Sequence, residues 1–509
     1  MTLKEAYERL RKEVLALRRE NEKLKAGTYT DAYENEIRRL KSALAAKEKE
    51  CERYHQLWRD CVHNGGNHET QMELGSLRLQ LQKANEVISK LKAQLNRNHE
   101  NSSIPSSQKP FHKRIKNSRE KTDRKPGAQK GHIGHKRPAA PKDNVVVTNI
   151  PATDEMQKDP DLYPTGAYIT RQLVDIQVNV VTTTYKAEIY RSRSTGKRIH
   201  APFPSGMTNE INYGPNVKAL AFLLNNYCNV SIDKTRELIS GMTSSEISLS
   251  SGFVNMLAER FSKKTEKERA DIYNRLLQAP AMYTDATAGR VNGKQVQVYV
   301  CANDSELLYF FRDHKGYEGL KGTPVEEYQQ ILIHDHDKTF YKYGGDHQEC
   351  LAHVLRYLQD SIENEQKLTW NTRMKKFLSG VIHETKQNRN IPEARILEIE
   401  EEYDRILRTA DLEYSANPPG KYYRDGYNLF CRLKEYRHNH LLFLRHPEID
   451  YTNNLSERAL RKFKRKFKQV VTFRSTESVE MLCNCLSILE TGRLQGKNPF
   501  DVARKAYAL

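Results

Sequence analysis

Three acidic residues of this chain lie where a strand end or a helix start could hold a divalent metal ion. Asp285 follows the apolar run 281–283, Asp335 follows the run 331–333, and Glu457 precedes a strongly basic stretch. Two hard cations that share carboxylate oxygens can activate a water or a 3′-hydroxyl and stabilise the leaving oxygen of a phosphodiester. The alternative for each acid is a helix cap or a surface charge, which most of the 65 Asp and Glu residues must be.

The segments around these acids predict elements that would bring them together. Two β-rich runs, 296–300 and 307–311, are separated by the turn signal 303–305, and Pro324 indicates a helix start before the run 331–333. The predicted order is three strands, a helix and a fourth strand. With acids on the first and fourth strands and on a late helix, this order is typical of an RNase H-like catalytic core in a multidomain α/β protein.

Several motifs resemble those of one enzyme family. They are 284–287 followed by 291–294, 350–353 after the second acid, 453–461 followed by 473–475, and 101–107 and 127–132 upstream. Together they are similar to transposases of the insertion-sequence-66 family, from about residue 70 to the C-terminus. The resemblance implies that Asp285, Asp335 and Glu457 form a DDE triad that binds two Mg²⁺ ions, with Mn²⁺ as a substitute ion. It also implies double-stranded DNA as partner, both transposon ends and target. The sequence leaves open whether accessory proteins are required, as they are for some relatives.

Further residues in these motifs are expected to support the triad: His336, Cys350, His353, Asn453 and Asn454. The two asparagines are expected to cap the helix that carries Glu457 and to orient its carboxylate. Capping alone is the alternative to a direct contact with substrate. Asp337 is the alternative metal ligand to Asp335, although Asp335 matches the family motif better.

The catalytic core is expected to be divided by an insertion. Residues 271–359 and 449–509 would form the core, and 360–448, which is rich in Glu, Lys, Arg and Leu, would form a helical insertion. Trp370 in this insertion could stack on a displaced base, but a single Trp is more often part of a core.

Residues 145–210 are expected to form a small β unit, because apolar runs occur at 145–147 and 173–181. Relatives commonly carry a Cys-x-x-Cys zinc fold here, whereas 140–210 contains no cysteine, so no structural zinc is expected. The eight cysteines elsewhere form no disulfide-like framework, and neither a signal peptide nor an 18-residue apolar span is found. A cytoplasmic, nucleoid-associated bacterial protein without membrane contact is the corresponding expectation.

The charge of the chain predicts a polyanionic partner. The net charge is +18, and residues 109–137 hold eleven Lys or Arg against Glu120 and Asp123. The region 98–144 is therefore expected to be a flexible segment that tracks DNA phosphates, with a merely solvated linker as the alternative. Its expected phosphate contacts are Lys113, Arg114, Lys116, Arg124, Lys125 and Lys130.

A second basic run follows the third acid. On a helix, Phe463 and Phe467 would face the core while the cations of 461–468 face outward. These cations are expected to hold the strand that is cut: Arg458, Arg461, Lys462, Lys464 and Arg465.

Residues 211–270 are expected to contain a helix-turn-helix-like region. Three helical patterns lie between 215 and 262, joined by short connections. In that arrangement Ser248, Ser250 and Ser251 would face the major groove, and helices that pack without binding DNA are the alternative.

The N-terminal residues 1–97 are expected to form a coiled-coil dimerisation arm. Leu3, Leu10, Leu17 and Leu24 recur every seven residues, and Asn21 lies in the same seam, where it favours two strands in register. A second heptad run covers 74–95. The alternative is a helix packed on its own globular domain.

These expectations combine into a homodimeric DDE transposase that binds the terminal inverted repeats of its element and cuts and rejoins DNA strands. One alternative is a catalytically silent dimeric DNA-binding regulator. A second is an RNase H-like nuclease that performs no strand transfer.

Overall fold

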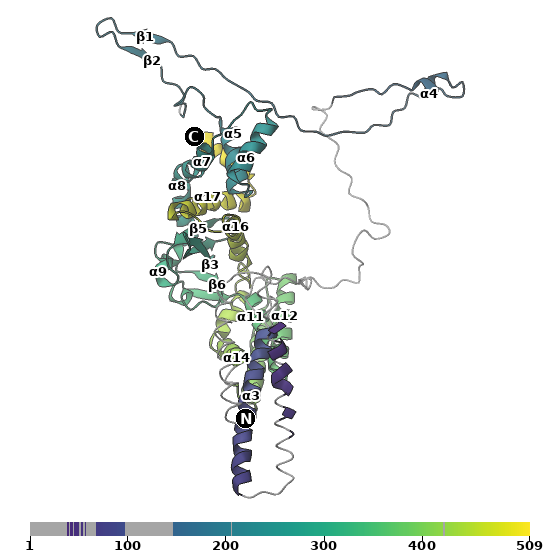
Figure 1. Ribbon diagram of the computed structural model, residues 1–509, viewed down its shortest axis with the longest axis vertical. Helices are drawn as coiled ribbons and strands as arrows, with labels where there is room; N and C mark the ends of the chain where they lie inside the picture. Colours follow the sequence, from purple (N-terminus) through teal and green to yellow (C-terminus); the bar gives the residue numbers. More distant parts are fainter. Residues whose placement is uncertain are drawn as a thin grey trace. The chain divides into compact units, whose positions relative to one another are not determined.

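The computed structural model describes residues 68–96, 146–204, 206–420 and 423–508, with several helical residues between 38 and 56. The chain divides into two compact units. The first contains residues up to 115, 211–232 and 252–509, and the second contains 116–210 and 233–251. Figure 1 labels many of the helices and strands.

A five-stranded mixed sheet forms the centre of the first unit. Its strands are β3 (Ala281–Val291), β4 (Lys294–Ala302), β5 (Leu307–Arg312), β6 (Ile331–His334) and β7 (Asp346–Glu349). In the sheet order β5-β4-β3-β6-β7, the first three strands are antiparallel, β6 runs parallel to β3, and β7 runs parallel to β6. The predicted β runs 296–300, 307–311 and 331–333 all lie in strands, whereas β7 was not predicted.

Short helices precede the fourth strand. The chain passes from β5 through α9 (Tyr317–Leu320) and α10 (Pro324–Glu327) before it enters β6. Pro324 begins α10 as expected, because its fixed φ suits the first helical position. The predicted order of three strands, a helical connection and a fourth strand is present.

Two late helices cover the antiparallel half of the sheet: α16 (Asn454–Val470) and α17 (Thr476–Leu494). Phe463 and Leu460 of α16 lie in one apolar cluster with Val298 and Val300 of β4. Ser487 and Thr491 of α17 accept hydrogen bonds from Tyr309 N and Leu307 N, each at 2.9 Å. These hydroxyls satisfy backbone donors of the edge strand β5.

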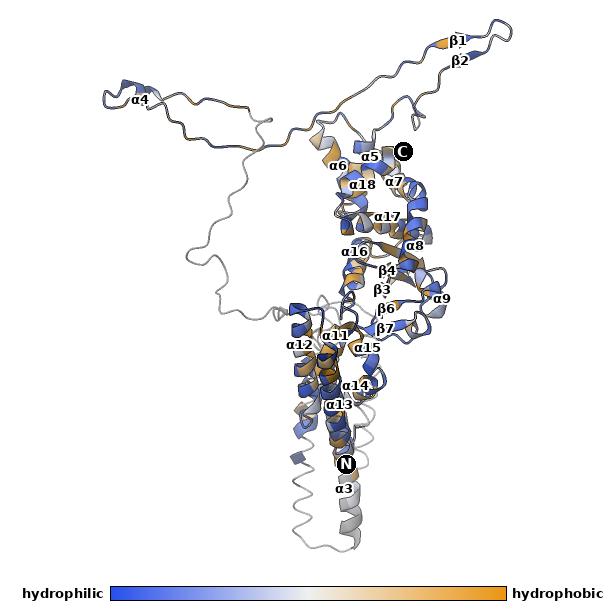
Figure 2. Cartoon of the chain, turned by 180° about the vertical axis from the view of Figure 1, so that it is seen from behind, coloured by the Kyte–Doolittle hydropathy of each residue, from blue (hydrophilic) through white to orange (hydrophobic). Residues whose placement is uncertain are grey.

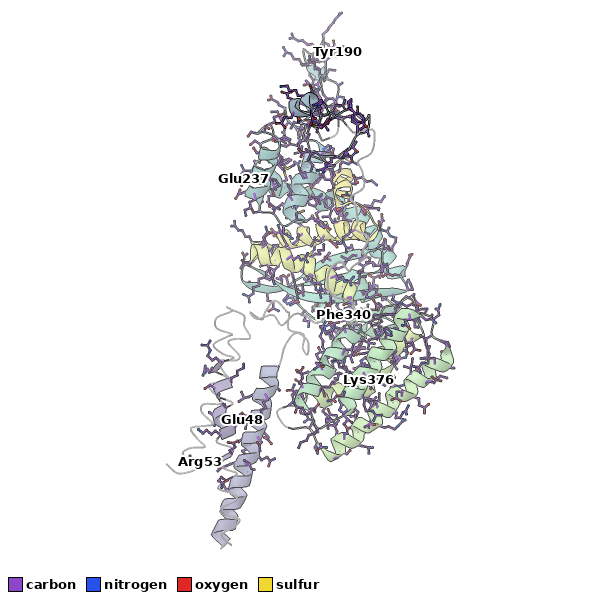
Figure 3. The ribbon with its side chains drawn as sticks, turned by 90° about the vertical axis from the view of Figure 1, so that its right-hand side faces the viewer. Glu48, Arg53, Tyr190, Glu237, Phe340 and Lys376 are labelled. Carbon is purple, nitrogen blue, oxygen red and sulfur yellow. The ribbon has the colours of Figure 1, made fainter. Side chains whose placement is uncertain are left out.

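A second apolar cluster joins the parallel half of the sheet to helices. These are α11 (Leu351–Asn364), α12 (Trp370–Gln387), α13 (Glu393–Ala416), α14 (Asp425–Glu435) and α15 (Arg437–Leu441). Trp370 is 0% exposed and packs against Tyr414 and Phe430, with ring centroids 6.0 Å apart in both pairs. Trp370 is therefore a core residue rather than a base-stacking one. Figure 3 places Lys376 of α12 among these helices and Phe340 close to the sheet.

The remaining helices of the first unit include α3 (His68–Asn96), α8 (Glu266–Gln278) and α18 (Pro499–Ala508). The helices predicted between 215 and 262 are present as α5 (Pro215–Asn226) and α7 (Ser251–Lys264), which lie in the first unit apart from Ser251, and α6 (Ile232–Met242), which lies in the second unit apart from Ile232. Whether they act as a helix-turn-helix stays a prediction. The zipper residues Leu3, Leu10, Leu17, Asn21 and Leu24 lie outside the described residues.

The prediction of a packed β unit at 145–210 is wrong for the described part of that region. Its strands are β1 (Ile189–Arg191) and β2 (Arg198–His200), which form one short antiparallel hairpin, and α4 (Asp154–Lys158) is its helix. Neither 146–147 nor 173–181 is in a strand, and Leu173 is 94% exposed. A two-stranded hairpin of three residues per strand cannot cover apolar side chains. Figure 2 shows the apolar residues scattered along these extended segments, and Tyr190, labelled in Figure 3, is 63% exposed.

Candidate active site

The sheet places the first two acids at the same level of neighbouring strands. Tyr283 of β3 is in parallel register with Ile333 of β6. Asp285 and Asp335 each come two residues later, and Asp335 directly follows the last residue of β6. Side chains two residues apart along a strand share a face, so the register puts both carboxylates at one edge of the parallel pair.

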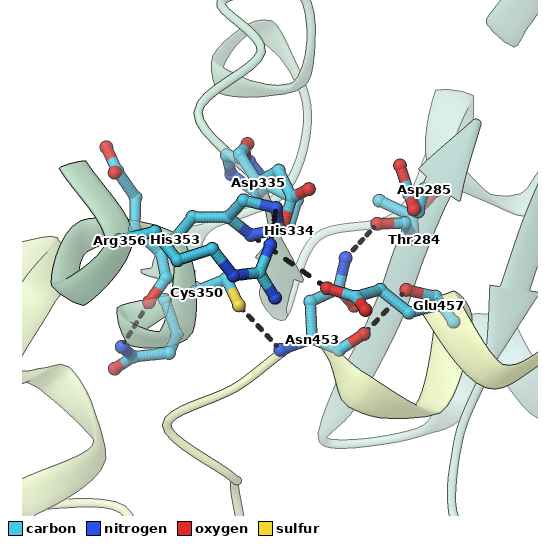
Figure 4. A network of polar contacts seen from close by, with 12 residues as sticks. Thr284, Asp285, His334, Asp335, Cys350, His353, Arg356, Asn453 and Glu457 are labelled. Atoms are coloured by element: carbon cyan, nitrogen blue, oxygen red, sulfur yellow. Dashed lines mark hydrogen bonds and ion pairs between the residues drawn. The ribbon is translucent and has the colours of Figure 1, made fainter. Parts of the chain in front are cut away.

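The third acid comes from the first turn of α16. Asn453 is the residue that precedes this helix, and Glu457 N donates to its carbonyl at 3.2 Å. The side chain of Asn453 does not cap the helix, which corrects the capping prediction. Instead, Asn453 Nδ2 donates to Thr284 O at 2.8 Å, one residue before Asp285 (Figure 4). Asn453 thus ties the start of α16 to the strand that carries the first acid.

Helix α11 adds two more donor groups beside the acids. Cys350 occupies the N-cap of α11, and its Sγ accepts a hydrogen bond from Asn453 N at 3.2 Å. His353 Nδ1 lies 3.1 Å from Asp335 Oδ1 and 4.0 Å from Glu457 Oε1. The structure therefore brings together Asp335, Glu457, Cys350 and His353, whose donor atoms all lie within 4.8 Å of one another.

Asp285 belongs electrostatically to the same cluster. Burial, together with the neighbouring Asp335 and Glu457 carboxylates, raises the pKa of Asp285 to about 7. The Ala286 N–H, which donates to Asp285 Oδ1 at 2.7 Å, and the His353 side chain act in the opposite direction. Like charges that crowd one another in this way are stabilised when a divalent cation binds between them.

The alternative ligand Asp337 is engaged elsewhere. Its Oδ2 pairs with Lys315 Nζ at 2.9 Å, and its Oδ1 accepts a hydrogen bond from Thr339 N at 3.0 Å. It is not part of the Asp335 cluster. Geometry therefore favours Asp335 over Asp337, as the family motif did.

His336 is not part of the cluster around Asp335 and contacts a buried glutamate that the sequence analysis missed. Glu349, at the end of β7, is 0% exposed; its Oε1 lies 2.7 Å from His336 Nδ1, and its Oε2 accepts from Arg432 Nε at 2.9 Å. His440 Nε2 lies 3.2 Å from the same Oε2. Burial alone would raise the pKa of Glu349, but the contacts with His336, His440 and Arg432 lower it far below its usual range. Glu349 thereby links the loop after Asp335 to α14 and α15.

The basic face of α16 lies next to Glu457. Arg458, Arg461, Lys464 and Arg465 are exposed, and Arg461 Nη2 pairs with Glu457 Oε2 at 3.0 Å.

The expectation that every cation of this run faces outward is wrong for two of them. Lys462 Nζ lies 3.5 Å from the fully buried Glu490. Lys466 is 9% exposed and donates to Asn225 O, and burial lowers its pKa to about 8. A helix with apolar residues on one face must also bury part of the neighbouring positions. The expected phosphate contacts Lys113, Arg114, Lys116, Arg124, Lys125 and Lys130 lie outside the described residues.

Arg356 is a second residue that the sequence analysis did not select. Its Nη1 lies 3.1 Å from His353 Nε2, so it contacts the side of the imidazole that faces away from the acids (Figure 4). Its position one helical turn after Cys350-Leu351-Ala352-His353 was the available signal, because residues three apart on a helix share a face.

Comparison with protein-family models gives two matches. Residues 213–481 match the model described as "Transposase IS66 family", and residues 9–138 match a family of unknown function, DUF6444. A search of curated proteins gives no match. In the described part of the chain, no helix is both long and apolar enough to span a membrane. The IS66 match contains Asp285, Asp335 and Glu457 and covers more than half of the 509 residues. This chain therefore belongs to the IS66 family of transposases.

Proposed function

We propose that this transposase cleaves and joins DNA strands by a two-metal DDE mechanism, with Asp285, Asp335 and Glu457 as the metal ligands. The observation that carries the proposal is the parallel register that sets Asp285 level with Asp335, together with the Asn453 hydrogen bond that ties the start of α16 to β3. The strand order and directions support an RNase H-like core. The substrate would be the terminal inverted repeats of its own element.

The residues fit a pair of hard divalent ions. Asp335 Oδ1 and Glu457 Oε1 are buried without a hydrogen-bond partner, and carboxylate oxygens are the donors that Mg²⁺ prefers. Two such ions, when bound, would activate the attacking water or 3′-hydroxyl and stabilise the leaving oxygen. The protein's own part is to hold the three carboxylates, through β3, β6 and α16, in one fixed arrangement.

The exposed cations of α16 would hold the DNA strand beside the acids. Arg461 pairs with Glu457 in the free protein, so a phosphate would take over the guanidinium when DNA binds. Lys464 and Arg465 continue the same basic face and are exposed. The segment 98–144 and the region around α5 to α7 would add further DNA contacts, and the N-terminal zipper would pair two protomers.

The test is a cleavage and strand-transfer assay with labelled double-stranded DNA that carries the inverted repeats of the element. The wild type should nick this DNA in Mg²⁺ or Mn²⁺, join it to a target molecule, and do neither in excess chelator. Cleavage without joining would favour an RNase H-like nuclease, and binding without cleavage in either metal would favour a regulator. Either of these results would overturn the proposal.

A further inference from the structure

The donor set beside the acids contains sulfur and nitrogen as well as oxygen. Magnesium sites use oxygen ligands, whereas a thiolate and an imidazole suit zinc and neighbouring transition ions. We propose that Cys350, His353, Asp335 and Glu457 form a four-ligand site for a Zn²⁺-class ion, which withdraws Asp335 and Glu457 from Mg²⁺. The competition with Mg²⁺ rests on the proposed function. The four-ligand site itself does not, because it is defined by its donor atoms alone.

Buried atoms without partners point into this site. Asp335 Oδ1, His353 Nδ1 and Glu457 Oε1 are all inaccessible to solvent and make no hydrogen bond of acceptable geometry. His353 is 8% exposed and Cys350 is 0% exposed. Leaving such groups unsatisfied costs about 1–3 kcal/mol each, and more when they are charged. One cation contacted by all of them removes that cost.

The spacing of the donors suits a four-coordinate ion. Bonds of about 2.0–2.3 Å place the ligands of a tetrahedral zinc site roughly 3.3–3.8 Å apart. The four donor atoms here lie within 4.8 Å of one another, and His353 Nδ1 is 3.1 Å from Asp335 Oδ1. Small side-chain rotations are sufficient to close the set around one ion.

Cys350 presents its sulfur at the start of a helix. The residue stands at the N-cap of α11, a helix of 14 residues, where the helix dipole stabilises negative charge. The Asn453 N–H points at its sulfur from 3.2 Å. Metal binding would release the thiol proton to solvent and leave the thiolate with this amide donor as an outer contact.

Arg356 opposes metal binding through His353. A guanidinium only donates hydrogen bonds, so His353 Nε2 accepts from Arg356 Nη1 and a neutral ring carries its proton on Nδ1. To bind an ion through Nδ1, the ring must give up that proton and take one on Nε2, and Arg356 must turn away. Removing the guanidinium should therefore tighten the site.

The test uses Co²⁺ as a spectroscopic probe on the full-length protein. Wild-type protein should give a near-ultraviolet sulfur-to-cobalt charge-transfer band and the intense visible bands of four-coordinate Co²⁺, at one equivalent per chain. Stoichiometric Zn²⁺ should abolish these bands, since Zn²⁺ binds such donors more tightly than Co²⁺, whereas a large excess of Mg²⁺ should not. Arg356→Met should lower the Co²⁺ dissociation constant several-fold.

Two variants assign the bands to this site. Cys350→Ser should lose the charge-transfer band, while Cys431→Ser, which changes a partly exposed cysteine of α14, should keep it. Should Cys350→Ser fail to fold, Asp335→Asn, at a partly exposed position, should still weaken Co²⁺ binding by more than tenfold.

No charge-transfer band in the wild type, or a band that persists in Cys350→Ser, would overturn the site. Chelator-sensitive cleavage in Mg²⁺ without any cobalt band would overturn the site and leave the proposed function standing. A cobalt band in a protein that never cleaves DNA would support the metal site and overturn the proposed function.

Discussion

Asn453 Nδ2 donates to the carbonyl of Thr284 at 2.8 Å and so joins the first residue before α16 to the residue before Asp285. The same residue donates its backbone N–H to Cys350 Sγ. Asn453 is 0% exposed, so both bonds form out of contact with water. One asparagine therefore fixes β3, α11 and α16 relative to each other at the point where their functional side chains meet.

Replacing Asn453 with alanine should damage both the fold and the site. The change leaves the Thr284 carbonyl without this donor, at a cost of about 1–3 kcal/mol in the free energy of unfolding. DNA cleavage should fall by a larger factor than the loss of folded protein explains, because the start of α16, which carries Glu457, is no longer tied to β3. The matched control is Asn454→Ala, one residue further on and partly exposed. Equal effects of both variants on cleavage would contradict the role given to Asn453.

Glu349→Gln should destabilise the protein in a pH-dependent way. The folded-state pKa of Glu349 lies far below its ordinary value of 4.5, so its contribution to stability is fully present above about pH 4.5 and is lost as the pH falls further. Breaking this buried pairing with Arg432 should cost about 3–5 kcal/mol at pH 7. The difference from the wild type should shrink in thermal melts below pH 4.5.

Glu365→Gln is the control for Glu349→Gln, because the pKa of Glu365 is shifted in the opposite direction. Burial raises the pKa of Glu365, so its charged form is a penalty in the folded state above its ordinary pKa of 4.5. Ser361 and Tyr414 donate to this carboxylate, and a glutamine oxygen can accept the same bonds. This variant should therefore be at least as stable as the wild type at pH 7. A large loss of stability there would contradict the assignment of its charge as unfavourable.

The basic face of α16 predicts a salt-dependent affinity for DNA. The double variant Lys464→Gln/Arg465→Gln should lower the slope of log affinity against log salt by roughly 0.9 for each phosphate contact that is lost. Lys505→Gln removes an exposed charge from α18 and should leave the slope unchanged. Filter binding or fluorescence anisotropy between about 50 and 200 mM salt measures the slope for both variants. An unchanged slope in the double variant would exclude this face from the interface.

The zipper predicts a dimer that one charged seam residue disrupts. Leu17→Lys in the full-length chain places a charge in the predicted seam and should shift the protein to a monomer in sedimentation-equilibrium runs. Leu15→Lys makes the same change two positions away, off the seam, and should leave the dimer intact. A Leu17→Lys protein that sediments like the wild type would contradict the proposed arm.

The sequence predicted the elements that carry their own signal. Strands β4, β5 and β6 are apolar and β-rich, and α16 shows its apolar face at Phe463 and Phe467. Strand β7 has the sequence Asp346-His-Gln-Glu349 and lacks any apolar pattern. It was missed because tertiary partners satisfy its polar side chains: Gln348 accepts from Phe443 N, and Glu349 contacts Arg432.

The candidate site was only partly predictable for a related reason. The three acids and the motif around His353 can be recognised in the sequence from their residue types and spacing. Which hydrogen bonds and ion pairs a side chain makes is decided by its neighbours in space. Asn453 has the type and position of a helix cap, yet its amide is taken by Thr284. Lys466 belongs to a basic run, yet it lies against the end of α5 and is buried. Neither partner is near in sequence.

The central claim is tested most directly by comparing two neighbouring acids in Mg²⁺-dependent cleavage of end DNA. Asp335→Asn keeps the shape of the side chain and removes the charge that binds a cation, so cleavage should fall by more than about 100-fold, the upper range for changes in outer-sphere residues alone. DNA binding should survive. Asp337→Asn removes a carboxylate that pairs with Lys315 instead and should cleave at nearly the wild-type rate. Near-normal Mg²⁺-dependent cleavage by Asp335→Asn, or an equal loss in Asp337→Asn, would contradict the assignment of Asp335 as a metal ligand.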